Sequence, residues 1–593
     1  MADTQTPADG LNYLQSLMQT GQELMQQFEH AVAAQTEATQ AAMKQGGAAA
    51  PWQPNALFPG FGAGAEPFAA MAEMQRRYAE QMTAMWNNAF LKPVLGETKS
   101  AAQPAKKDKR FRDEAWEEQP FFDVLKQSYL INTKFLRDFV DNADVDERTK
   151  MQLRFYARQY ADALSPANFP ATNPEVIKKA IETKSESIAA GMRNLIADIQ
   201  KGRITRVDED AFEVGKNLAA TPGAIVFENE LIQLIQYKPA TETIERMPLL
   251  MVPPCINKFY ILDLQPGNSL VEWAVAQGHR VFLISWRSAN QDISHLTWDD
   301  YLEKGIFKAM DVIAEITGEP KLHALGFCVG GTLLGSAAGV LAARGDTRVN
   351  SLTLLTTMLD FVDTGDIGLL IDENYVATRE AMIGRGGILP GKELAFTFGT
   401  LRANDLIWPY VVNNYLKGES HDAFDLLYWD SDSVNLPGPM YCWYTRNMYL
   451  ENKLKQPGGT VQCGTPVDLS KVTAPTYVLA SKEDHIVPWK SAYQTTKIVG
   501  GDVRFVLGAS GHVAGVINPP AKNKRSHWKN EGAADAADTW FESSTEHKGS
   551  WWPDWDSWLK EHGAGPIAAT EPGSKKYPVI EPAPGRYVRE KSN

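Results

Sequence analysis

Hydrophobic positions follow two different patterns along this chain, and the change falls near Pro222. From about residue 116 to residue 202, apolar side chains recur at helical intervals. Beyond Pro222, short apolar runs alternate with helical stretches at residues 269–277, 298–316 and 332–344. The strands are expected at residues 224–227, 231–237, 249–252, 280–285, 321–326, 351–356, 476–480 and 503–507. Apolar strands separated by helices predict a parallel sheet covered by helices on both faces.

The strand–helix alternation stops between residues 359 and 472. This stretch is rich in aromatic residues, namely Trp408, Tyr410, Tyr415, Tyr428, Trp429, Tyr441, Trp443, Tyr444 and Tyr449. We expect it to form a cap, at about residues 360–472, inserted into the sheet domain. Aromatic side chains line apolar pockets as well as cores, so such a cap could exclude water from a site beneath it.

The N-terminal part of the chain predicts two further regions. Residues 1–110 are expected to form an extension, poorly ordered or helical, with a candidate amphipathic helix within residues 1–50 and a linker at residues 44–66. Residues 111–205 are expected to form an all-helical domain. The sheet domain with its cap then occupies residues 206–593.

Composition limits the classes of protein to consider. The chain has 593 residues, too many for one ordinary core, so more than one domain is expected. A formal net charge of −13 and the lack of a basic stripe argue against a nucleic-acid binder. The start lacks the pattern of a secretory signal, and we find no apolar run long enough to predict a transmembrane segment. The cysteines, Cys255, Cys328, Cys442 and Cys463, are too few for a disulfide framework and fit a reducing cytoplasm.

The segment that carries chemistry is Gly-Phe-Cys-Val-Gly-Gly at residues 326–331, between a predicted strand and a predicted helix. This is the pattern of a nucleophile elbow with Cys328 in the place of serine. Gly326 and Gly330 leave room for a sharp turn, and a helix N-terminus favours a thiolate. The alternative is a buried core cysteine on a glycine turn. The strand before the motif and the helix after it favour the nucleophile.

A nucleophile of this kind needs a base and an acid that orients the base, both on loops after later strands. The last two predicted strands lead to Asp484 and His512, in that order. Both residues therefore fall at strand ends, where α/β proteins build their sites. Glu483 and His485 compete for the same roles. The strand-end position favours Asp484, and the preceding glycine favours His512.

Acyl transfer also needs backbone N–H groups that stabilise an oxyanion. Val329, directly after the nucleophile, is expected to supply one. The second should come from the loop after the strand at residues 249–252, where two prolines have no N–H and leave Cys255 or Ile256, with Ile256 preferred. A cysteine that attacks a thioester forms another thioester of similar energy, which suits acyl transfer from coenzyme A.

Several long segments resemble class I polyhydroxyalkanoate synthases, the type that makes poly(3-hydroxybutyrate). They are VPPCINKFYILDL at residues 252–264, GFCVGGT at 326–332, EDHIVPW at 483–489, GASGHVAGVINPPAKNKRSHW at 508–528, GSWWPDW at 549–555 and SPANFPATNP at 165–174. The resemblance implies an α/β-hydrolase catalytic domain with a mobile cap, preceded by an all-helical N-terminal domain. It also implies that Cys328 carries the growing chain and His512 activates the thiol. Asp484 then orients His512 and helps to deprotonate the incoming 3-hydroxyl.

The implied reaction is the polymerisation of (R)-3-hydroxyacyl-CoA, in the first place 3-hydroxybutyryl-CoA, into polyester through an acyl-cysteine thioester. Coenzyme A is then the leaving group of the substrate, and no cofactor or metal is expected. The resemblance further implies a homodimer at the surface of cytoplasmic polyhydroxyalkanoate granules, together with granule-associated proteins. The preferred chain length of the substrate stays open. It also stays open whether elongation proceeds on one thiol or alternates with a free, non-covalent intermediate linked to coenzyme A.

Two other functions compete with this one. A cysteine α/β hydrolase such as a thioesterase has the same three residues and differs in its product, although the large cap argues against it. A non-catalytic granule protein on a hydrolase scaffold is disfavoured by the intact Cys328, Asp484 and His512. A serine lipase is disfavoured because the elbow holds cysteine.

Two surface features also carry expectations. The basic run could meet coenzyme A phosphates or form a solvated face; it consists of Lys522, Lys524, Arg525 and Lys529. The tryptophan-rich segment at residues 551–555 is expected to pack on the sheet domain rather than to bind substrate.

Overall fold

The computed structural model describes residues 65–95, 100–106, 108–530, 532 and 534–592, with backbone alone for residues 65–70 and 90–95. The amphipathic helix expected within residues 1–50 lies outside these ranges. So does the linker expected at residues 44–66, up to the start of helix α2 at Ala65. The chain divides into two compact units, which are Met1–Arg206 with Gly399–His421, and Val207–Phe398 with Asp422–Asn593.

The second unit is built on one sheet of 11 strands, in the order β15-β14-β13-β12-β7-β6-β4-β5-β2-β1-β17. The strands from β13 to β5 in this order run parallel, and those on either side pair antiparallel. In chain order they are β1 (Gly223–Glu228), β2 (Ile232–Tyr237), β4 (Pro248–Val252), β5 (Arg280–Trp286), β6 (Leu322–Phe327), β7 (Val349–Leu355), β12 (Thr476–Ser481), β13 (Val503–Gly508), β14 (Ser526–Lys529), β15 (Thr545–Lys548) and β17 (Glu581–Pro582). All the predicted strands are confirmed. The sequence did not reveal β14 and β15, because these short strands at one end of the sheet are mostly polar and lack an apolar alternation.

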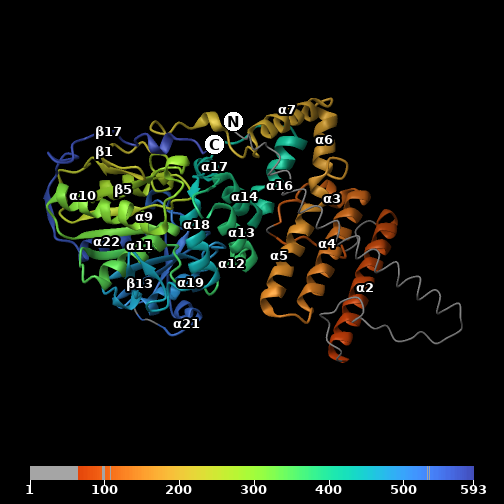
Figure 1. The fold of residues 1–593 in the computed structure, drawn as a ribbon. Helices are drawn as coiled ribbons and strands as arrows, with labels where there is room; N and C mark the ends of the chain where they lie inside the picture. Colours follow the sequence, from red (N-terminus) through yellow and green to blue (C-terminus); the bar gives the residue numbers. More distant parts are fainter. Residues whose placement is uncertain (1–64, 96–99, 107, 531, 533, 593) are drawn as a thin grey trace. The chain divides into compact units, whose positions relative to one another are not determined.

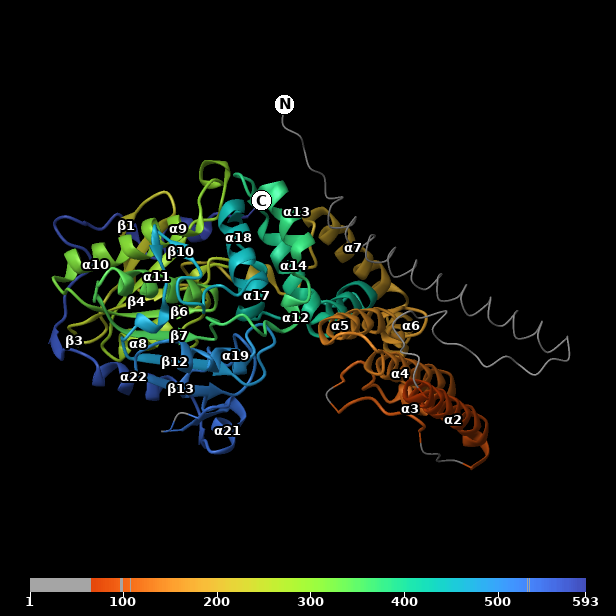
Figure 2. The same ribbon diagram turned by 60° about the horizontal axis from the view of Figure 1, so that its bottom comes forward.

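Helices cover both faces of the sheet, as predicted (Figures 1 and 2), and each face carries a hydrophobic core. Alternate residues of β4 divide between them: Leu250 and Val252 belong to one core, and Leu249 and Met251 to the other. This division follows from the two-residue period of a strand. The first core is completed by α10 (Lys308–Thr317) and α11 (Val329–Ala343), and the second by α8 (Leu270–Ala276) and α22 (Trp552–Glu561).

The tryptophan-rich segment lies in the second of these cores. Trp551, Trp552 and Trp555 are each at most 1% exposed. The Trp555 Nε1 group donates a hydrogen bond to Thr353 Oγ1 of β7 at 3.0 Å. The expectation that this segment packs on the sheet domain is confirmed.

Between β7 and β12 the chain is mainly helical. In the second unit this stretch contributes α12 (Gly365–Gly368), α13 (Glu373–Ile383), most of α14 (Gly391–Leu401), α17 (Asp425–Ser431), α18 (Gly438–Tyr444) and the π-helical turn η8 (Thr445–Leu450). The rest of the stretch, Gly399–His421, belongs to the first unit. The predicted cap at residues 360–472 therefore contributes to both units.

The first unit is all-helical in its described part. Its helices are α2 (Ala65–Leu95), α3 (Ala115–Glu118), α4 (Pro120–Asp141), α5 (Glu147–Ala163), α6 (Pro174–Glu182), α7 (Glu186–Lys201), α15 (Ala403–Leu406), α16 (Trp408–Tyr410) and the π-helical turn η7 (Val411–Leu416). Helix α6 begins at Pro174, directly after Asn173, whose side chain accepts from the N–H of Glu175 and Val176. Within the described residues, no helix has the length and apolar character that crossing a bilayer requires.

Candidate active site

Cys328 stands at the sharp turn between β6 and α11. Its backbone has φ +55° and ψ −128°, a strained conformation for a residue with a side chain. The Cys328 N–H donates to Leu355 O at 2.9 Å, which ties the turn to β7. A Cβ on Gly326 would lie 2.4 Å from Gly331 Cα, and a Cβ on Gly330 would lie 2.4 Å from Val252 O. The turn therefore requires glycine on both sides of the cysteine.

Asp484 and His512 meet at the ends of β12 and β13. His512 Nδ1 lies 2.7 Å from Asp484 Oδ2. The other carboxylate oxygen, Asp484 Oδ1, accepts from the N–H of Ile486 at 2.8 Å and of Val487 at 2.9 Å. Because both carboxylate oxygens are engaged and the side chain is fully buried, the carboxylate is held in one orientation.

The other side of the His512 ring faces the nucleophile, with Cys328 within hydrogen-bonding reach. Burial by itself lowers the pKa of His512, but the negative charges of Asp484 and Cys328, and the hydrogen bonds to them, raise this pKa well above its ordinary value. The raised pKa makes His512 a stronger proton acceptor for the Cys328 thiol. An arrangement of this kind is suited to nucleophilic attack on an acyl carbon.

The structure separates the residues that competed for the acid and the base. Glu483 is exposed, and its neighbour Asp484 is the carboxylate that meets His512. His485 is partly buried, and the bond to Asp484 is made by His512.

Phe327 is a site residue that the sequence reasoning missed. Its ring is fully buried and stacks on the His512 imidazole, with centroids 5.5 Å apart and an interplanar angle of 24°. An aromatic face against an imidazolium is favourable. The sequence signal that could have revealed it is an aromatic residue directly before the predicted nucleophile.

Both predicted oxyanion donors lie beside the nucleophile. The backbone N–H groups of Val329 and Ile256 make no hydrogen bond with any described residue, and both residues line the same cavity as Cys328. Cys255 also lines this cavity, and burial raises the pKa of its thiol. Cys255 and Ile256 therefore both remain candidates for the second N–H donor.

The loop that carries Ile256 is held on several sides. Pro253 O accepts from Trp286 Nε1 at 2.9 Å, and Ile256 O accepts from Val434 N at 3.0 Å. Lys258 ends the loop. Its ammonium group is buried and donates to Tyr587 O and Glu590 O of the C-terminal tail.

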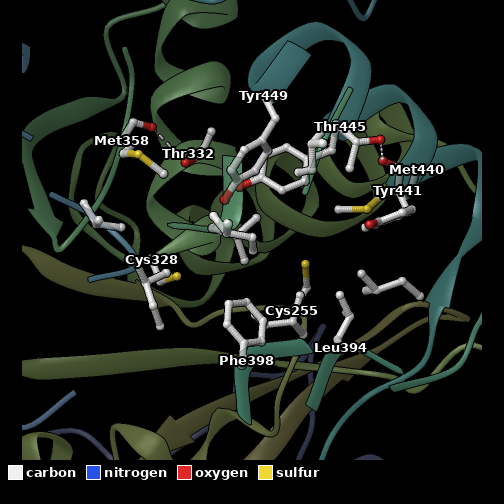
Figure 3. A pocket seen from close by; sticks show the side chains of 18 residues that line it. Cys255, Cys328, Thr332, Met358, Leu394, Phe398, Met440, Tyr441, Thr445 and Tyr449 are labelled. Atoms are coloured by element: carbon white, nitrogen blue, oxygen red, sulfur yellow. Dashed lines mark hydrogen bonds between the residues drawn. The ribbon is translucent and has the colours of Figure 1, made fainter. Parts of the chain in front are cut away.

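The cavity beside Cys328 is small, about 60 Å³, and mostly apolar (Figure 3). Its walls come mainly from three parts of the chain. These are the nucleophile elbow, the loop at residues 253–258 after β4 (the oxyanion loop), and the helices between β7 and β12. Of the aromatic residues predicted for the cap, Tyr441, Tyr444 and Tyr449 line it. The remaining lining residues are Cys255, Ile256, Cys328, Val329, Thr332, Met358, Ile367, Ile371, Leu394, Phe398, Leu436, Met440, Thr445, Ile486 and Val487.

The basic run after His512 is partly used inside the protein. Lys522 Nζ donates to Asn268 Oδ1 at 2.8 Å, and Lys529 Nζ pairs with Asp554 at 2.7 Å. Lys524 and Arg525 are exposed. Lys522 is exposed as well and keeps further N–H donors, so Lys522, Lys524 and Arg525 are available to an anionic ligand.

Comparisons with known proteins identify the fold and the family. Residues 107–274 match a family described as the N-terminus of poly-beta-hydroxybutyrate polymerase (PhaC), and residues 248–519 match the alpha/beta hydrolase fold. The chain is 50% identical to the poly(3-hydroxyalkanoate) polymerase subunit PhaC of Cupriavidus necator, over 88% of this chain and 89% of that protein. It is 41% identical to the PhaC subunit of Rhizobium meliloti, over 85% of this chain and 83% of the relative. It is also 41% identical to a poly(3-hydroxyalkanoate) polymerase of Methylorubrum extorquens, over 88% of this chain and 87% of that protein. The predicted α/β-hydrolase fold is thereby confirmed.

Proposed function

Because the chain belongs to the poly(3-hydroxyalkanoate) polymerase family, we propose that it polymerises (R)-3-hydroxyacyl-CoA, with 3-hydroxybutyryl-CoA as the first substrate to test. The products are a polyester and free coenzyme A. The observation that carries the proposal is the placement of Cys328 at a strained elbow, within reach of a His512 that is held by Asp484. Such a set is able to carry an acyl group as a thioester.

In the loading step, His512 takes the proton of the Cys328 thiol. The thiolate sulfur attacks the thioester carbonyl carbon of the substrate, and the N–H groups of Val329 and Ile256 stabilise the oxyanion. The bond from this carbon to the sulfur of coenzyme A then breaks. The leaving thiolate takes the proton back from His512, so that coenzyme A departs as a thiol and the acyl group stays on Cys328.

In the elongation step, the 3-hydroxyl oxygen of an incoming unit attacks the acyl-Cys328 carbonyl carbon. An ester bond forms, the carbon–sulfur bond breaks, and the hydroxyl proton passes through His512 to the Cys328 thiolate. Asp484 stabilises the imidazolium that forms in both steps. The joined units keep a thioester end, which Cys328 can attack again.

The same set of residues would hydrolyse the acyl-enzyme if water reached it. The small apolar cavity supports polymerisation, because it leaves little room for water beside the thioester. Coenzyme A enters the reaction as the leaving group of the substrate, and we propose that the chain needs no further cofactor or metal.

The test incubates purified protein with 3-hydroxybutyryl-CoA, follows coenzyme A release with a thiol reagent, and examines the mixture for insoluble polyester. We expect release together with polymer, and neither in the Cys328→Ala variant. Coenzyme A release with free 3-hydroxybutyrate as the only other product would instead establish a thioesterase. Full polymer formation by Cys328→Ala would remove the proposed nucleophile.

We also propose the setting that the family resemblance implies, a homodimer at the surface of cytoplasmic polyester granules. Sedimentation of the purified chain would give its oligomeric state. A fluorescent fusion in polyester-accumulating cells would show whether the chain gathers at granules. A monomer throughout, or a diffuse signal beside visible granules, would contradict the respective part.

A further inference from the structure

Few polar side chains face the cavity, and most of them already have partners in the protein. Thr332 Oγ1 donates to Met358 O at 2.9 Å, and Thr445 Oγ1 donates to Tyr441 O at 3.0 Å. The Tyr441 hydroxyl pairs with that of Tyr375 at 2.7 Å. The two threonine donors are therefore used within the protein, and the Tyr441 hydroxyl is already paired with a residue that does not line the cavity.

Tyr444 and Tyr449 differ from them. Their rings meet edge to face, with centroids 5.4 Å apart, and their hydroxyls lie within hydrogen-bonding reach of each other. Neither hydroxyl has another partner among the described residues. Because one O–H can donate to the other oxygen, the pair keeps one O–H group that is not used within the protein.

This unused donor lies close to the nucleophile. Tyr449 projects from the cap with its hydroxyl towards the part of the cavity where Cys328 lies (Figure 3). Burial raises the pKa of both phenols, and the nearby charge of Cys328 raises each pKa further. Both groups consequently remain protonated at neutral pH and can act as donors.

We propose that the Tyr444–Tyr449 pair binds the 3-hydroxyl of the acyl group that is transferred to Cys328, and so selects 3-hydroxyacyl over plain acyl thioesters. This inference rests on the proposed function. The carbonyl oxygen of the acyl group is directed to backbone N–H groups, whereas the 3-hydroxyl projects into the apolar cavity. A hydroxyl that enters such a space loses its bonds to water and needs a partner.

The selectivity follows from the cost of an unpaired group. A site that is built to bond a substrate hydroxyl binds the analogue without it less well, because a buried donor is then left unpaired. Butyryl-CoA is such an analogue, since it has the same carbon chain as 3-hydroxybutyryl-CoA and lacks the hydroxyl. The two substrates therefore isolate the contribution of this one group.

The experiment measures first-turnover coenzyme A release and the mass of the acyl-enzyme with each substrate. For the unaltered chain we expect 3-hydroxybutyryl transfer to exceed butyryl transfer by about tenfold or more. In Tyr449→Phe, and in the double variant that also carries Tyr444→Phe, the 3-hydroxybutyryl rate should fall about tenfold more than the butyryl rate. The matched control is Tyr375→Phe, which removes a hydroxyl from the other tyrosine pair but does not line the cavity, and it should keep the preference.

The outcomes separate this inference from the proposed function. If the unaltered chain transfers neither acyl group to Cys328, the proposed function itself fails. If transfer is intact but the preference is absent, or survives in both phenylalanine variants, the tyrosine pair does not bind the hydroxyl. Equal losses for the two substrates would likewise overturn the inference, because they would indicate a role in holding the cavity in shape.

Discussion

At Gly330 the chain passes so close to the oxyanion loop that a Cβ atom would lie 2.4 Å from Val252 O and 2.5 Å from Pro253 O. Both neighbours are backbone atoms at the end of β4, so neither can move without shifting the loop that carries Ile256. The close approach at Gly330 thus couples the position of the Cys328 turn to that of the proposed second oxyanion donor.

Gly330→Ala should therefore impair both folding and activity. We expect a loss of about 2 kcal/mol in the free energy of unfolding and a fall of about a hundredfold in coenzyme A release. Gly532→Ala is the matched control, because its Cβ would approach no atom closer than 3.7 Å. Urea unfolding and initial rates measure the two effects. Near-normal activity of Gly330→Ala would show that the elbow tolerates a side chain there.

His323 shows at the residue scale how burial controls the protonation of a side chain. It lies in β6, is 2% exposed, and its Nδ1 meets Ser351 Oγ at 2.6 Å. Burial above all, and then the neighbouring His279 and His562, lower its pKa from 6.5 to about 3. The folded chain therefore holds this histidine neutral, whereas the unfolded chain protonates it at mildly acidic pH.

The sign of the pH dependence follows directly. The contribution of neutral His323 to stability is complete above pH 6.5 and is lost as the pH falls towards about 3. The loss is about 1.4 kcal/mol for each pH unit below the unfolded pKa. Urea unfolding between about pH 7 and pH 5 should show a shallower pH slope for His323→Gln than for the unaltered chain. Exposed His295→Gln should keep the slope, and equal slopes for all three would contradict the assignment.

At the scale of elements, the C-terminal tail is hydrogen-bonded to the end of the oxyanion loop. Lys258 is 2% exposed, and its Nζ donates to Glu590 O at 2.6 Å and to Tyr587 O at 3.3 Å. Its own carbonyl accepts from Trp429 Nε1 at 2.7 Å. Through its ammonium group and its carbonyl, Lys258 therefore joins three segments that lie far apart in the sequence.

Lys258→Met keeps the aliphatic stem and removes these bonds. We expect it to lower the free energy of unfolding by about 1–3 kcal/mol, and to expose the tail to carboxypeptidase, because the tail carbonyls lose their donor. The matched control is Lys591→Met, since Lys591 is 69% exposed and lies 3.8 Å from Asp432. An ion pair that an exposed lysine makes at this distance contributes at most about 1 kcal/mol. Equal effects of the two variants would mean that the buried bonds do not hold the tail.

At the scale of the whole molecule, the first unit draws on two distant parts of the chain. Tyr415 OH donates to Asp198 Oδ2 at 2.6 Å, and Asn414 Nδ2 donates to Thr205 O at 2.7 Å. Helix α7 and the turn η7 approach so closely that a Cβ on Gly191 would lie 1.9 Å from Tyr415 O. Only a glycine in α7 allows this packing.

Gly191→Ala should therefore loosen the first unit and leave the sheet of the second intact. Hydrogen exchange followed by mass spectrometry should show faster exchange in α7 and η7, equivalent to about 1–3 kcal/mol, with β6 and β12 unchanged. Gly399→Ala, in α14, meets nothing closer than 3.9 Å and serves as the control. Exchange that rises equally in both units would show that they unfold as one.

The sequence by itself determined the features that depend on neighbours in the chain. Apolar periodicity is a local property, so it revealed the central strands and their positions along the chain. The elbow was recognisable because the sterics of a strand-to-helix turn require glycines at fixed distances from Cys328. The positions of Asp484 and His512 followed from the strands that precede them.

Only the tertiary structure decided what depends on contacts between distant segments. It showed that Asp484, and not Glu483, faces His512, because burial selects one side of the loop. It also assigned residues 399–421 to the helical unit and placed Lys258 beneath the C-terminal tail. No local pattern encodes such pairings, since each is fixed by the space and the unpaired polar groups that folding leaves at one place.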